Sequence, residues 1–310
     1  MSHSTSVVVN QCIGCQYEGY SVAGPLGEAI SEEIDGRKFR QPEYSIRECA
    51  RCGLLYRSPV LSAEEFGDYY ATKNFRDWET PGLFPTERAV LTVLRALPHG
   101  AKVLDFGCSS GRLLAELGNG YDRYGVEINQ EAATVAASKG IKMVTSEAFD
   151  ALEPSFDAVV LVDVFEHLTT PTEQLAKLTR ILKPGGILVV VTGDGDNRIC
   201  RLNPADFWYF LIIEHVGMLT KRYAEWLCGQ LKLELKAWQR VSHYDPKWPS
   251  TVEQWSRQFS YWQFRTGRPI VRGLLRMIPW VRNAESRDKP PIWQFSADHV
   301  VAVFSKLRTP

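Results

Sequence analysis

The sequence predicts an α/β fold with a doubly wound parallel sheet. Helical and strand patterns alternate from about residue 84 to 240, which is typical of helices that connect parallel strands. The predicted strands are nearly continuous apolar runs, as expected for a sheet that is covered by helices on both faces. With 310 residues, 45% of them hydrophobic, the chain is long enough for one large domain with small additions.

Each element of this region follows from a local pattern. Residues 86–97 carry apolar side chains three or four positions apart, which predicts a helix, and residues 102–105 are a short apolar strand that runs into Gly107. Residues 183–186 (KPGG) end a helix before the next strand. Further helices are expected at 112–117, 130–139, 172–182 and 220–231, and further strands at 124–128, 142–145, 156–164, 187–192, 233–240 and 300–304.

The charge balance and the start of the chain limit the function classes. The 36 Lys and Arg residues equal the 36 Asp and Glu residues, so there is no general basic field for a nucleic-acid partner. The apolar run at residues 7–9 is too short for a signal peptide, and no window approaches the roughly 18 apolar residues of a transmembrane segment. We therefore expect a cytoplasmic protein.

A glycine-containing turn follows the strand at 102–105. Its sequence, VLDFGCSSG at residues 103–111, places the backbone where it can approach a ligand at the carboxyl end of the sheet. Asp105 lies two residues before Gly107, and Glu127 ends the next strand, where an acidic residue can hold ribose hydroxyls. The loop lacks the G-x-G-x-x-G spacing of NAD sites, and Asp105 would repel a pyrophosphate but attract an ammonium group. These features favour S-adenosylmethionine.

Here the sequence resembles the class I S-adenosylmethionine-dependent methyltransferases, over about residues 91–231. The matching segments are VLDFGCSSG, YGVEIN, FDAVVLVDVFEHL and LKPGGILVVV, in this order. The resemblance implies a Rossmann-like, seven-stranded methyltransferase sheet in which the last strand pairs antiparallel beside the sixth. The family usually has Gly where Ser109 stands and often has Asp where Glu147 stands.

The resemblance also implies the cofactor-binding residues. Asp105 lines the methionine end of the cofactor, Glu127 holds the ribose, and residues 146–149 lie beside the adenine. Asp163 and residues 165–167 close the fourth strand and face cofactor and substrate, with the alternative that Glu166 and His167 only hydrogen-bond neighbouring loops. The expected cofactor-binding set is Asp105, Gly107, Cys108, Gly111, Glu127, Ile128, Glu147, Ala148, Asp163 and Val164.

Four of the seven cysteines form two C-x-x-C pairs, and the odd total without a secretion signal argues against a disulfide framework. Two such pairs can supply four thiolates in a tetrahedron, as a structural Zn²⁺ site requires. The alternative is a set of reduced thiols without metal. The segment CARCGLLY, followed by SP, resembles the zinc-ribbon-like N-terminus of bacterial methyltransferases that modify sugars or polysaccharide precursors. The expected ligands are Cys12, Cys15, Cys49 and Cys52.

The residues after the fifth strand are candidates for the acceptor side. An oxygen acceptor must lose a proton, which favours a histidine base near neutral pH. In related enzymes an aromatic stretch followed by a histidine lies over the methyl donor; here residues 207–210 precede Glu214 and His215. His215 is the first candidate base, with Glu214 to orient it, although it can also be a structural histidine that caps the helix at 220–231. Further candidates are His167, His243 and, for a carbon acceptor, Tyr209 and Tyr223.

Five segments are expected along the chain. They are a zinc-ribbon-like segment at 1–60, a linker with helices at 61–98, the S-adenosylmethionine-binding core at 99–244, a helical C-terminal insertion at 245–294, and a final core strand at 295–310. The insertion has four interpretations: a lid over the acceptor, a peripheral membrane contact, a dimer contact, or a helix pair packed on the core. Its arginines would suit a substrate phosphate.

These observations lead to one main hypothesis and two alternatives. The main hypothesis is methyl transfer from S-adenosylmethionine to a small-molecule acceptor, namely the oxygen or carbon of a sugar, nucleotide-sugar or glycan precursor. The first alternative is an RNA-directed methyltransferase that binds RNA through the cysteine pairs. The second is an NAD-dependent sugar oxidoreductase, against which the glycine spacing and Asp105 argue.

Overall fold

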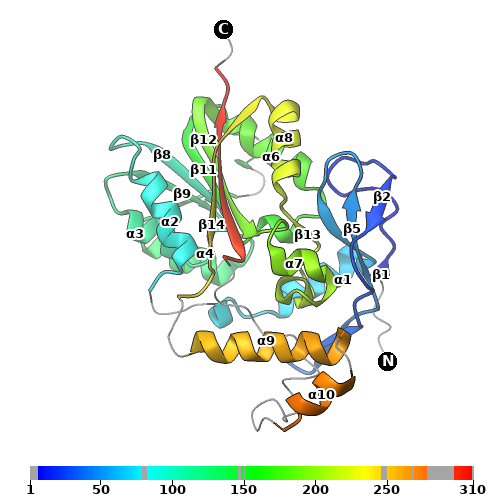
Figure 1. Ribbon diagram of the computed structural model, residues 1–310. Coiled ribbons are helices and arrows are strands. Elements are labelled where there is room, and N and C mark those ends of the chain that lie inside the picture. The colour runs from blue at the N-terminus through cyan, green and yellow to red at the C-terminus, as the bar shows by residue number, and fades with distance from the viewer. Residues whose placement is uncertain are drawn as a thin grey trace.

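A seven-stranded mixed sheet forms the centre of the computed structural model, which describes residues 6–78, 82–145, 148–149, 151–245, 250–266, 269–277 and 297–308 (Figure 1). The strand order is β10-β9-β8-β11-β12-β15-β14, and only β15 runs against its neighbours. This order confirms the predicted sheet, with the last strand antiparallel beside the sixth. The strands are β8 (Lys102–Phe106), β9 (Asp122–Val126), β10 (Lys142–Met143), β11 (Phe156–Val162), β12 (Leu182–Gly193), β14 (Leu233–Val241) and β15 (His299–Lys306).

Helices cover both faces of this sheet, as the apolar strands predict. On β11, Val159 packs in the core that includes Leu175 of α6 and Leu227 of α8, whereas its neighbour Val160 packs in the core that includes Leu91 of α2. Successive residues of one strand therefore bury opposite faces. The helices are α2 (Pro85–Leu94), α3 (Arg112–Leu117), α4 (Gln130–Ser138), α6 (Pro171–Ile181) and α8 (Lys221–Leu231).

Two strand boundaries differ from the sequence prediction. The third strand is shorter than 142–145, because only Lys142 and Met143 pair with β9. The fifth strand begins at Leu182 rather than at 187, because Leu182 pairs with Phe156 before the ladder shifts register and resumes at Ile187. Hydrogen bonding to a neighbouring strand sets both boundaries, and a local apolar pattern does not contain that information.

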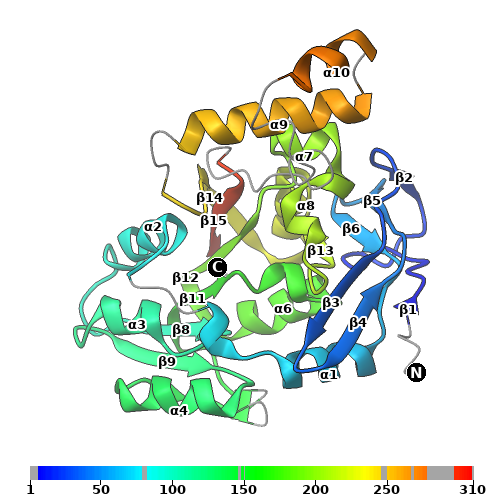
Figure 2. The ribbon, with the colours of Figure 1, turned by 90° about the horizontal axis from the view of Figure 1, so that it is seen from below.

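The N-terminal segment builds a second, four-stranded sheet in the order β13-β6-β5-β2. Its first strand comes from far along the chain, since Gly217 pairs with Tyr56 and Met218 with Leu55. A separate hairpin, β3–β4, lies alongside α1, where Phe39 packs against Tyr69 (Figure 2). These elements are β1 (Ser6–Val7), β2 (Tyr20–Val22), β3 (Ile30–Ile34), β4 (Arg37–Gln41), β5 (Ser45–Cys49), β6 (Leu55–Ser58), β7 (Val60–Leu61), α1 (Ala63–Thr72) and β13 (Gly217–Met218).

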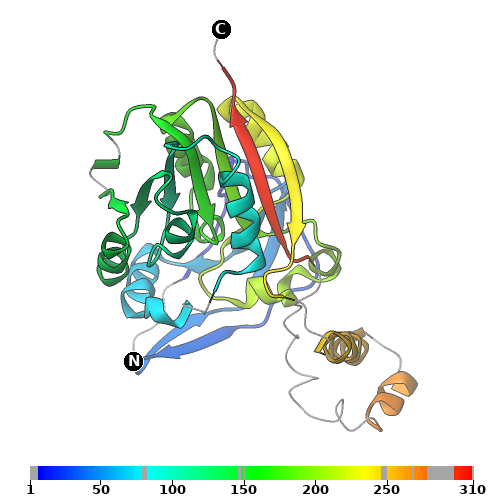
Figure 3. The same ribbon diagram turned by 90° about the vertical axis from the view of Figure 1, so that its left-hand side faces the viewer.

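The predicted insertion forms two helices in its described part, α9 (Ser250–Thr266) and α10 (Pro269–Leu275). Helix α9 runs beneath the edge at which the parallel strands end, and Figure 3 shows it nearly end-on below β14 and β15. Several predicted features of the insertion, including Trp248, Trp280 and Trp293, lie outside the described residues. None of the helices in the described part of the chain combines the length and apolar content that a membrane crossing needs.

Short helical segments line the same edge of the sheet. They follow β11 and β12, and they carry His167 and Tyr209 among the residues that the sequence singled out for the acceptor side. These segments are η2 (Phe165–His167), α7 (Arg198–Leu202), η3 (Pro204–Asp206) and η4 (Trp208–Leu211), and a further one, η1 (Phe75–Trp78), follows α1.

Candidate active site

The sheet topology brings five titratable residues to one edge. Asp105, Glu127 and Asp163 stand at or just after the ends of β8, β9 and β11, which are parallel. His243 follows β14, which also ends at this edge. His299 opens the antiparallel β15 and pairs with Gly193, the last residue of β12. Residues from five strand ends therefore meet where ligands of open α/β sheets bind.

The glycine loop after β8 has the backbone that its sequence predicts. Gly107 and Gly111 have φ values of +81° and +75°, and Ser109 has a φ of +47°. The left-handed conformation at Ser109 is the physical reason why glycine suits that position. A Cβ atom on Gly107 would lie 2.5 Å from Val164 Cγ2, so a side chain there would collide with the end of β11.

The carboxylate of Glu127 is held by the loop around it. One oxygen accepts a hydrogen bond from the Ser109 amide at 2.9 Å and the other accepts one from the Asn129 amide at 2.8 Å. Ile128 beside it is 70% exposed, whereas Cys108 is buried. Of the two residues expected near an adenine, Ala148 lies in a short helical stretch and Glu147 lies outside the described residues.

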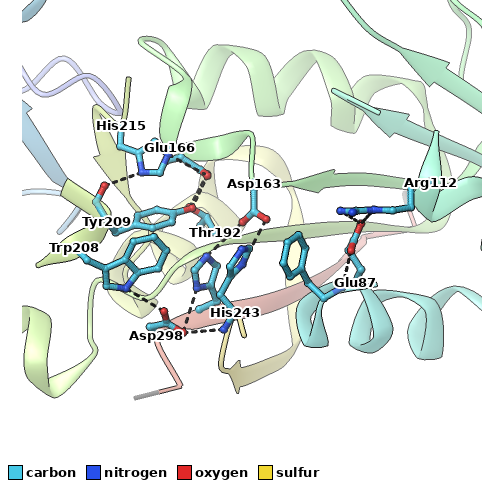
Figure 4. Close-up of polar contacts among 12 residues, drawn as sticks. Glu87, Arg112, Asp163, Glu166, Thr192, Trp208, Tyr209, His215, His243 and Asp298 are labelled. Carbon is cyan, nitrogen blue, oxygen red and sulfur yellow. Dashed lines mark hydrogen bonds and ion pairs between the residues drawn. The ribbon is translucent and has the colours of Figure 1, made fainter. Parts of the chain in front are cut away.

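Asp105 is buried without a full set of partners. Its side chain is 3% exposed, and its Oδ1 atom has no hydrogen-bond partner in the described part of the chain. Burial, together with the negative charges of Glu87 and Glu127, raises the pKa of Asp105 to about 8. Arg112, at the start of α3, pairs with Glu87 at 2.9 Å (Figure 4). The geometry gives a carboxyl group that favours a cationic neighbour.

The first of two polar clusters centres on Glu166 and is called the Glu166 cluster. Thr192 Oγ1 donates to Glu166 Oε2 at 2.8 Å, and the Tyr209 hydroxyl donates to Oε1 (Figure 4). Burial raises the pKa of both Glu166 and Tyr209. Nε2 of His167 and Nε2 of His215 each lie 3.9 Å from Glu166 Oε1. Both oxygens of this carboxylate therefore have hydroxyl donors.

His215 is oriented by the backbone of the aromatic segment. Its Nδ1–H donates to the Tyr209 carbonyl at 2.7 Å, which leaves Nε2 as the acceptor nitrogen of the neutral ring. Burial, with His167 nearby, lowers the pKa of His215 well below its usual value. Glu214, expected to orient His215, instead accepts from the Tyr69 hydroxyl at 2.6 Å.

The other candidate catalytic residues have different partners. His167 Nδ1 lies 2.9 Å from the Tyr70 hydroxyl, and the His167 and His215 rings meet edge to face at 4.8 Å. Tyr223 bonds Thr172 at 2.7 Å and packs in the core with the cysteines. Of the aromatic run at residues 207–210, Phe207 and Phe210 are buried in the core.

A second polar cluster, the Asp163 cluster, consists of Asp163, His243 and His299. His299 Nε2 lies 3.5 Å from Asp163 Oδ1, and His243 Nδ1 lies 3.9 Å from Asp163 Oδ2. Burial acts to raise the pKa of Asp163, but His299 and His243 lower it on balance. Burial disfavours the His299 imidazolium, yet Asp163 and Asp298 raise the pKa of His299 to about 10.

Sequence reasoning missed His299 and Asp298, and considered His243 only as a base. A signal was present, because the antiparallel last strand of the expected sheet begins at the edge where the parallel strands end. Arg57 was also missed. This fully buried side chain donates to the carbonyls of Ile213 at 2.8 Å and Ile212 at 3.0 Å, and also to that of Phe210.

The two cysteine pairs converge as their spacing predicts. Cys12 Sγ lies 3.6 Å from Cys52 Sγ, Cys15 Sγ lies 3.4 Å from Cys49 Sγ, and all four sulfurs lie within 4.8 Å of one another. The Gly14 amide donates to Cys12 Sγ at 3.4 Å. Four thiolates around Zn²⁺, with bonds of about 2.3 Å, are roughly 3.8 Å apart, so this arrangement fits a tetrahedral ion.

Comparison with known proteins gives the family context. A family described as "Methyltransferase domain" matches residues 74–237, just over half the chain. A ubiquinone biosynthesis O-methyltransferase of Alkalilimnicola ehrlichii is 26% identical over 52% of this chain and 60% of that protein. A tRNA (carboxymethyluridine(34)-5-O)-methyltransferase of Arabidopsis thaliana is 26% identical over 55% of this chain and 45% of that protein. The chain thus spans less than two thirds of either relative.

An S-adenosylmethionine-dependent methyltransferase of Methanosarcina mazei superposes with a TM-score of 0.45 and 17% sequence identity. The superposition covers 70% of this chain and 98% of that one.

Proposed function

This chain belongs to the S-adenosylmethionine-dependent methyltransferase family, and we propose that its acceptor is an oxygen or a carbon of a small molecule. The observation that carries the proposal is the enclosure of the Glu166 cluster. His215 is 5% exposed and Glu166 is fully buried. A small acceptor can be enclosed beside such a base, whereas RNA binding relies on a basic surface, and the formal net charge is zero.

We further propose that the acceptor is a sugar, a nucleotide sugar or a glycan precursor. Hydrogen-bonding side chains lie beside His215, namely Glu166 at 3.9 Å and the His167 ring at 4.8 Å, and such groups suit a molecule with several hydroxyls. Helix α9 supports a lid role for the insertion, because its Tyr261 hydroxyl donates to Asp206 Oδ2 at 2.7 Å and so ties it to the acceptor-side segments.

The residues of the glycine loop fit the methyl donor. The unpartnered Oδ1 atom of Asp105 would accept from the ammonium group, and the fixed carboxylate of Glu127 would accept from the ribose hydroxyls. The missing side chain at Gly107 lets Val164 pack against the loop, and Asp163 and Val164 would close the methionine end. When bound, S-adenosylmethionine supplies a methyl group activated by a positively charged sulfur.

His215 is the proposed base for an oxygen acceptor. Its Nε2 atom would take the hydroxyl proton as the oxygen attacks the methyl carbon, since its Nδ1 proton is fixed on the Tyr209 carbonyl. Glu166, 3.9 Å away, would stabilise the resulting imidazolium. Tyr209 acts here as a hydrogen-bond donor to Glu166, because burial raises its pKa.

The proposed function is tested first by binding of S-adenosylmethionine and then by methyl transfer to candidate acceptors. Calorimetric titration should show saturable binding of S-adenosylmethionine, no competition by NAD, and weaker binding by an Asp105→Ala variant. Labelled methyl groups should then pass to a member of a panel of nucleotide sugars and glycan precursors. Preference for NAD would refute the cofactor assignment, and labelling of tRNA or rRNA instead of the panel would refute the small-molecule acceptor.

Replacement of the base should reduce turnover without reducing donor binding. We expect His215→Asn to lower kcat by about 100-fold or more, because general base catalysis contributes about that much. The lowered pKa keeps the parent imidazole neutral, so kcat should stay on its plateau as pH falls through 6.5. His99→Asn is the matched control, since His99 is exposed and stacks on Tyr121. A change below threefold would exclude His215 as the base.

We also propose that Cys12, Cys15, Cys49 and Cys52 hold one structural Zn²⁺. The sulfurs pack in the same core as Tyr223 and Leu227 of α8, so loss of the ion should disturb the whole fold. Cys49→Ser should remove the zinc found by elemental analysis and lower the thermal midpoint. Cys228→Ser, a half-buried cysteine outside the cluster, should change neither. Equal zinc content in both variants would disprove the assignment.

A further inference from the structure

We propose that Asp163, His243 and His299 bind one divalent ion of the first transition row. The three residues come from the end of β11, the segment after β14 and the start of β15. One potential ligand atom from each side chain lies within 4.8 Å of the other two. Figure 4 shows the side chains of Asp163 and His243 facing each other across this site.

The spacing of the ligand atoms suits a metal ion. His299 Nε2 is 3.5 Å from Asp163 Oδ1, and His243 Nδ1 is 3.9 Å from Asp163 Oδ2. Ligands with bonds of about 2.1 Å lie roughly 3.0 to 3.5 Å apart around an ion. Side-chain shifts of a few tenths of an ångström would therefore complete the coordination geometry.

The same atoms are buried without partners. Asp163 Oδ1, His243 Nδ1 and His299 Nε2 form no hydrogen bond within the described ranges of the chain. About nine in ten buried polar atoms of folded proteins have at least one partner. Three unpartnered atoms that converge on one point therefore indicate a ligand that the chain does not supply.

The surroundings of His299 match those of a metal-binding histidine. Its second nitrogen, Nδ1, lies 3.4 Å from Asp298 Oδ1, although the two atoms do not form a hydrogen bond in the described part of the chain. Asp298 is fixed in turn by the Trp208 indole N–H at 3.1 Å and by the His243 backbone amide at 2.9 Å (Figure 4). A carboxylate behind a metal-binding imidazole orients the ring and makes it a better ligand. Asp298 would perform that role here.

The donor set selects the kind of ion. Two imidazoles and one carboxylate favour Zn²⁺, Fe²⁺, Co²⁺ or Mn²⁺ over Mg²⁺ or Ca²⁺, which prefer oxygen ligands. Three protein ligands leave coordination positions open. On the proposed function, an acceptor oxygen would occupy one of them, and the ion would lower the pKa of that hydroxyl.

An alternative without an ion is an imidazolium at His299 between Asp163 and Asp298. That arrangement balances the carboxylates, but it gives His243 Nδ1 no partner. The two interpretations differ in what the cluster binds, so metal titration separates them.

The experiment uses the full chain loaded with one equivalent of Zn²⁺, which fills the cysteine site, and titrates it with Co²⁺. We expect one further Co²⁺ to bind, with weak absorption and without the intense thiolate bands of a cysteine site. His243→Gln and His299→Gln should each weaken this binding by at least about tenfold. His99→Gln should leave it unchanged, and circular dichroism with S-adenosylmethionine titration should show that all variants fold.

The Co²⁺ titration supports or overturns the metal site, and the S-adenosylmethionine titration tests the proposed function separately. Loss of Co²⁺ affinity in the two cluster variants, with donor binding retained, supports the metal site. Failure of the parent to bind Co²⁺ while it binds S-adenosylmethionine would overturn the site and leave the proposed function standing. Co²⁺ binding that both cluster variants retain would place the ion elsewhere and would also overturn it. Failure to bind S-adenosylmethionine would concern the proposed function alone.

Discussion

The two polar clusters at the end of the sheet contain the same residue types in opposite states. Each combines one carboxylate with two imidazoles. In the Glu166 cluster, hydroxyls of Thr192 and Tyr209 donate to the two carboxylate oxygens. In the Asp163 cluster, the atoms that face one another lack hydrogen bonds in the described part of the chain. The chain completes the first cluster, whereas the second is arranged to be completed by a ligand.

The pKa directions follow the same division. Burial raises the pKa of Glu166, whereas His167 and the hydrogen bond from the Tyr209 hydroxyl act to lower it. The two histidines of the Asp163 cluster lower the pKa of Asp163 on balance, despite its burial. A lowered pKa favours a negatively charged Asp163, which suits a cation. The Glu166 side chain already has two hydroxyl donors from the chain itself. Substitutions in the two clusters should therefore have different effects on stability.

The largest expected change in stability comes from a substitution in the Glu166 cluster. Glu166→Ala should lower the free energy of unfolding by about 4 kcal/mol, because it removes a buried group and leaves two hydroxyl donors unpaired. Urea denaturation measures the change, and Glu153→Ala, at an exposed site, is the control. A loss below 1 kcal/mol would mean that the hydrogen bonds of Glu166 contribute little to stability, and that the two clusters do not differ in this respect.

A second prediction concerns Asp105, the other buried carboxyl with an unpartnered oxygen. Its folded-state pKa of about 8 lies above its usual value of 3.8, so the folded protein holds a proton that the unfolded chain has released. The parent therefore loses stability as pH rises from about 4 to 8. Asp105→Asn removes this loss, and its advantage should grow by up to about 1.4 kcal/mol per pH unit.

Donor-free urea denaturation between pH 5 and pH 8 measures this trend. Asp35→Asn, at an exposed hairpin tip, should run parallel to the parent at every pH. A constant difference between the parent and Asp105→Asn would show that the Asp105 carboxyl titrates normally and has a partner in solution.

The smallest expected change in stability comes from a substitution in the Asp163 cluster. Without added metal, His243→Gln should change the free energy of unfolding by about 1 kcal/mol, because Nδ1 has no hydrogen bond to lose within the described residues, whereas the ring loses its stacking on Phe84 and His299. Saturating Co²⁺ should stabilise the parent but not the variant. A large loss in metal-free protein would show that His243 is a structural residue.

Features with a local signature were predictable from the sequence. The strands of the sheet are predicted by apolar runs between glycine and proline breaks. The positions of Asp105 and Glu127 at strand ends are predicted by their distances to the glycine loop. The convergence of the two cysteine pairs, Cys12 with Cys15 and Cys49 with Cys52, is predicted by their C-x-x-C spacing. In each case the residues involved are close in sequence or belong to one repeated pattern.

Features set by long-range contacts were not predictable. Glu214 was expected to orient His215, but it accepts a hydrogen bond from Tyr69 on α1, which lies 145 positions earlier in the sequence. Arg57 meets the acceptor-side carbonyls across more than 150 positions of sequence. His299 joins the Asp163 cluster only because β15 enters the sheet between β12 and β14.

The pairing of β13 with β6 bears on how this architecture can diversify. A strand that follows the acceptor-side segments completes the sheet of the N-terminal cysteine segment, and Arg57 anchors the carbonyls between them. Recombination between residues 62 and 100 would separate these partners. An exchange of the N-terminal segment alone would leave β13 without the strand that it pairs with, so we expect a functional exchange to need both parts together.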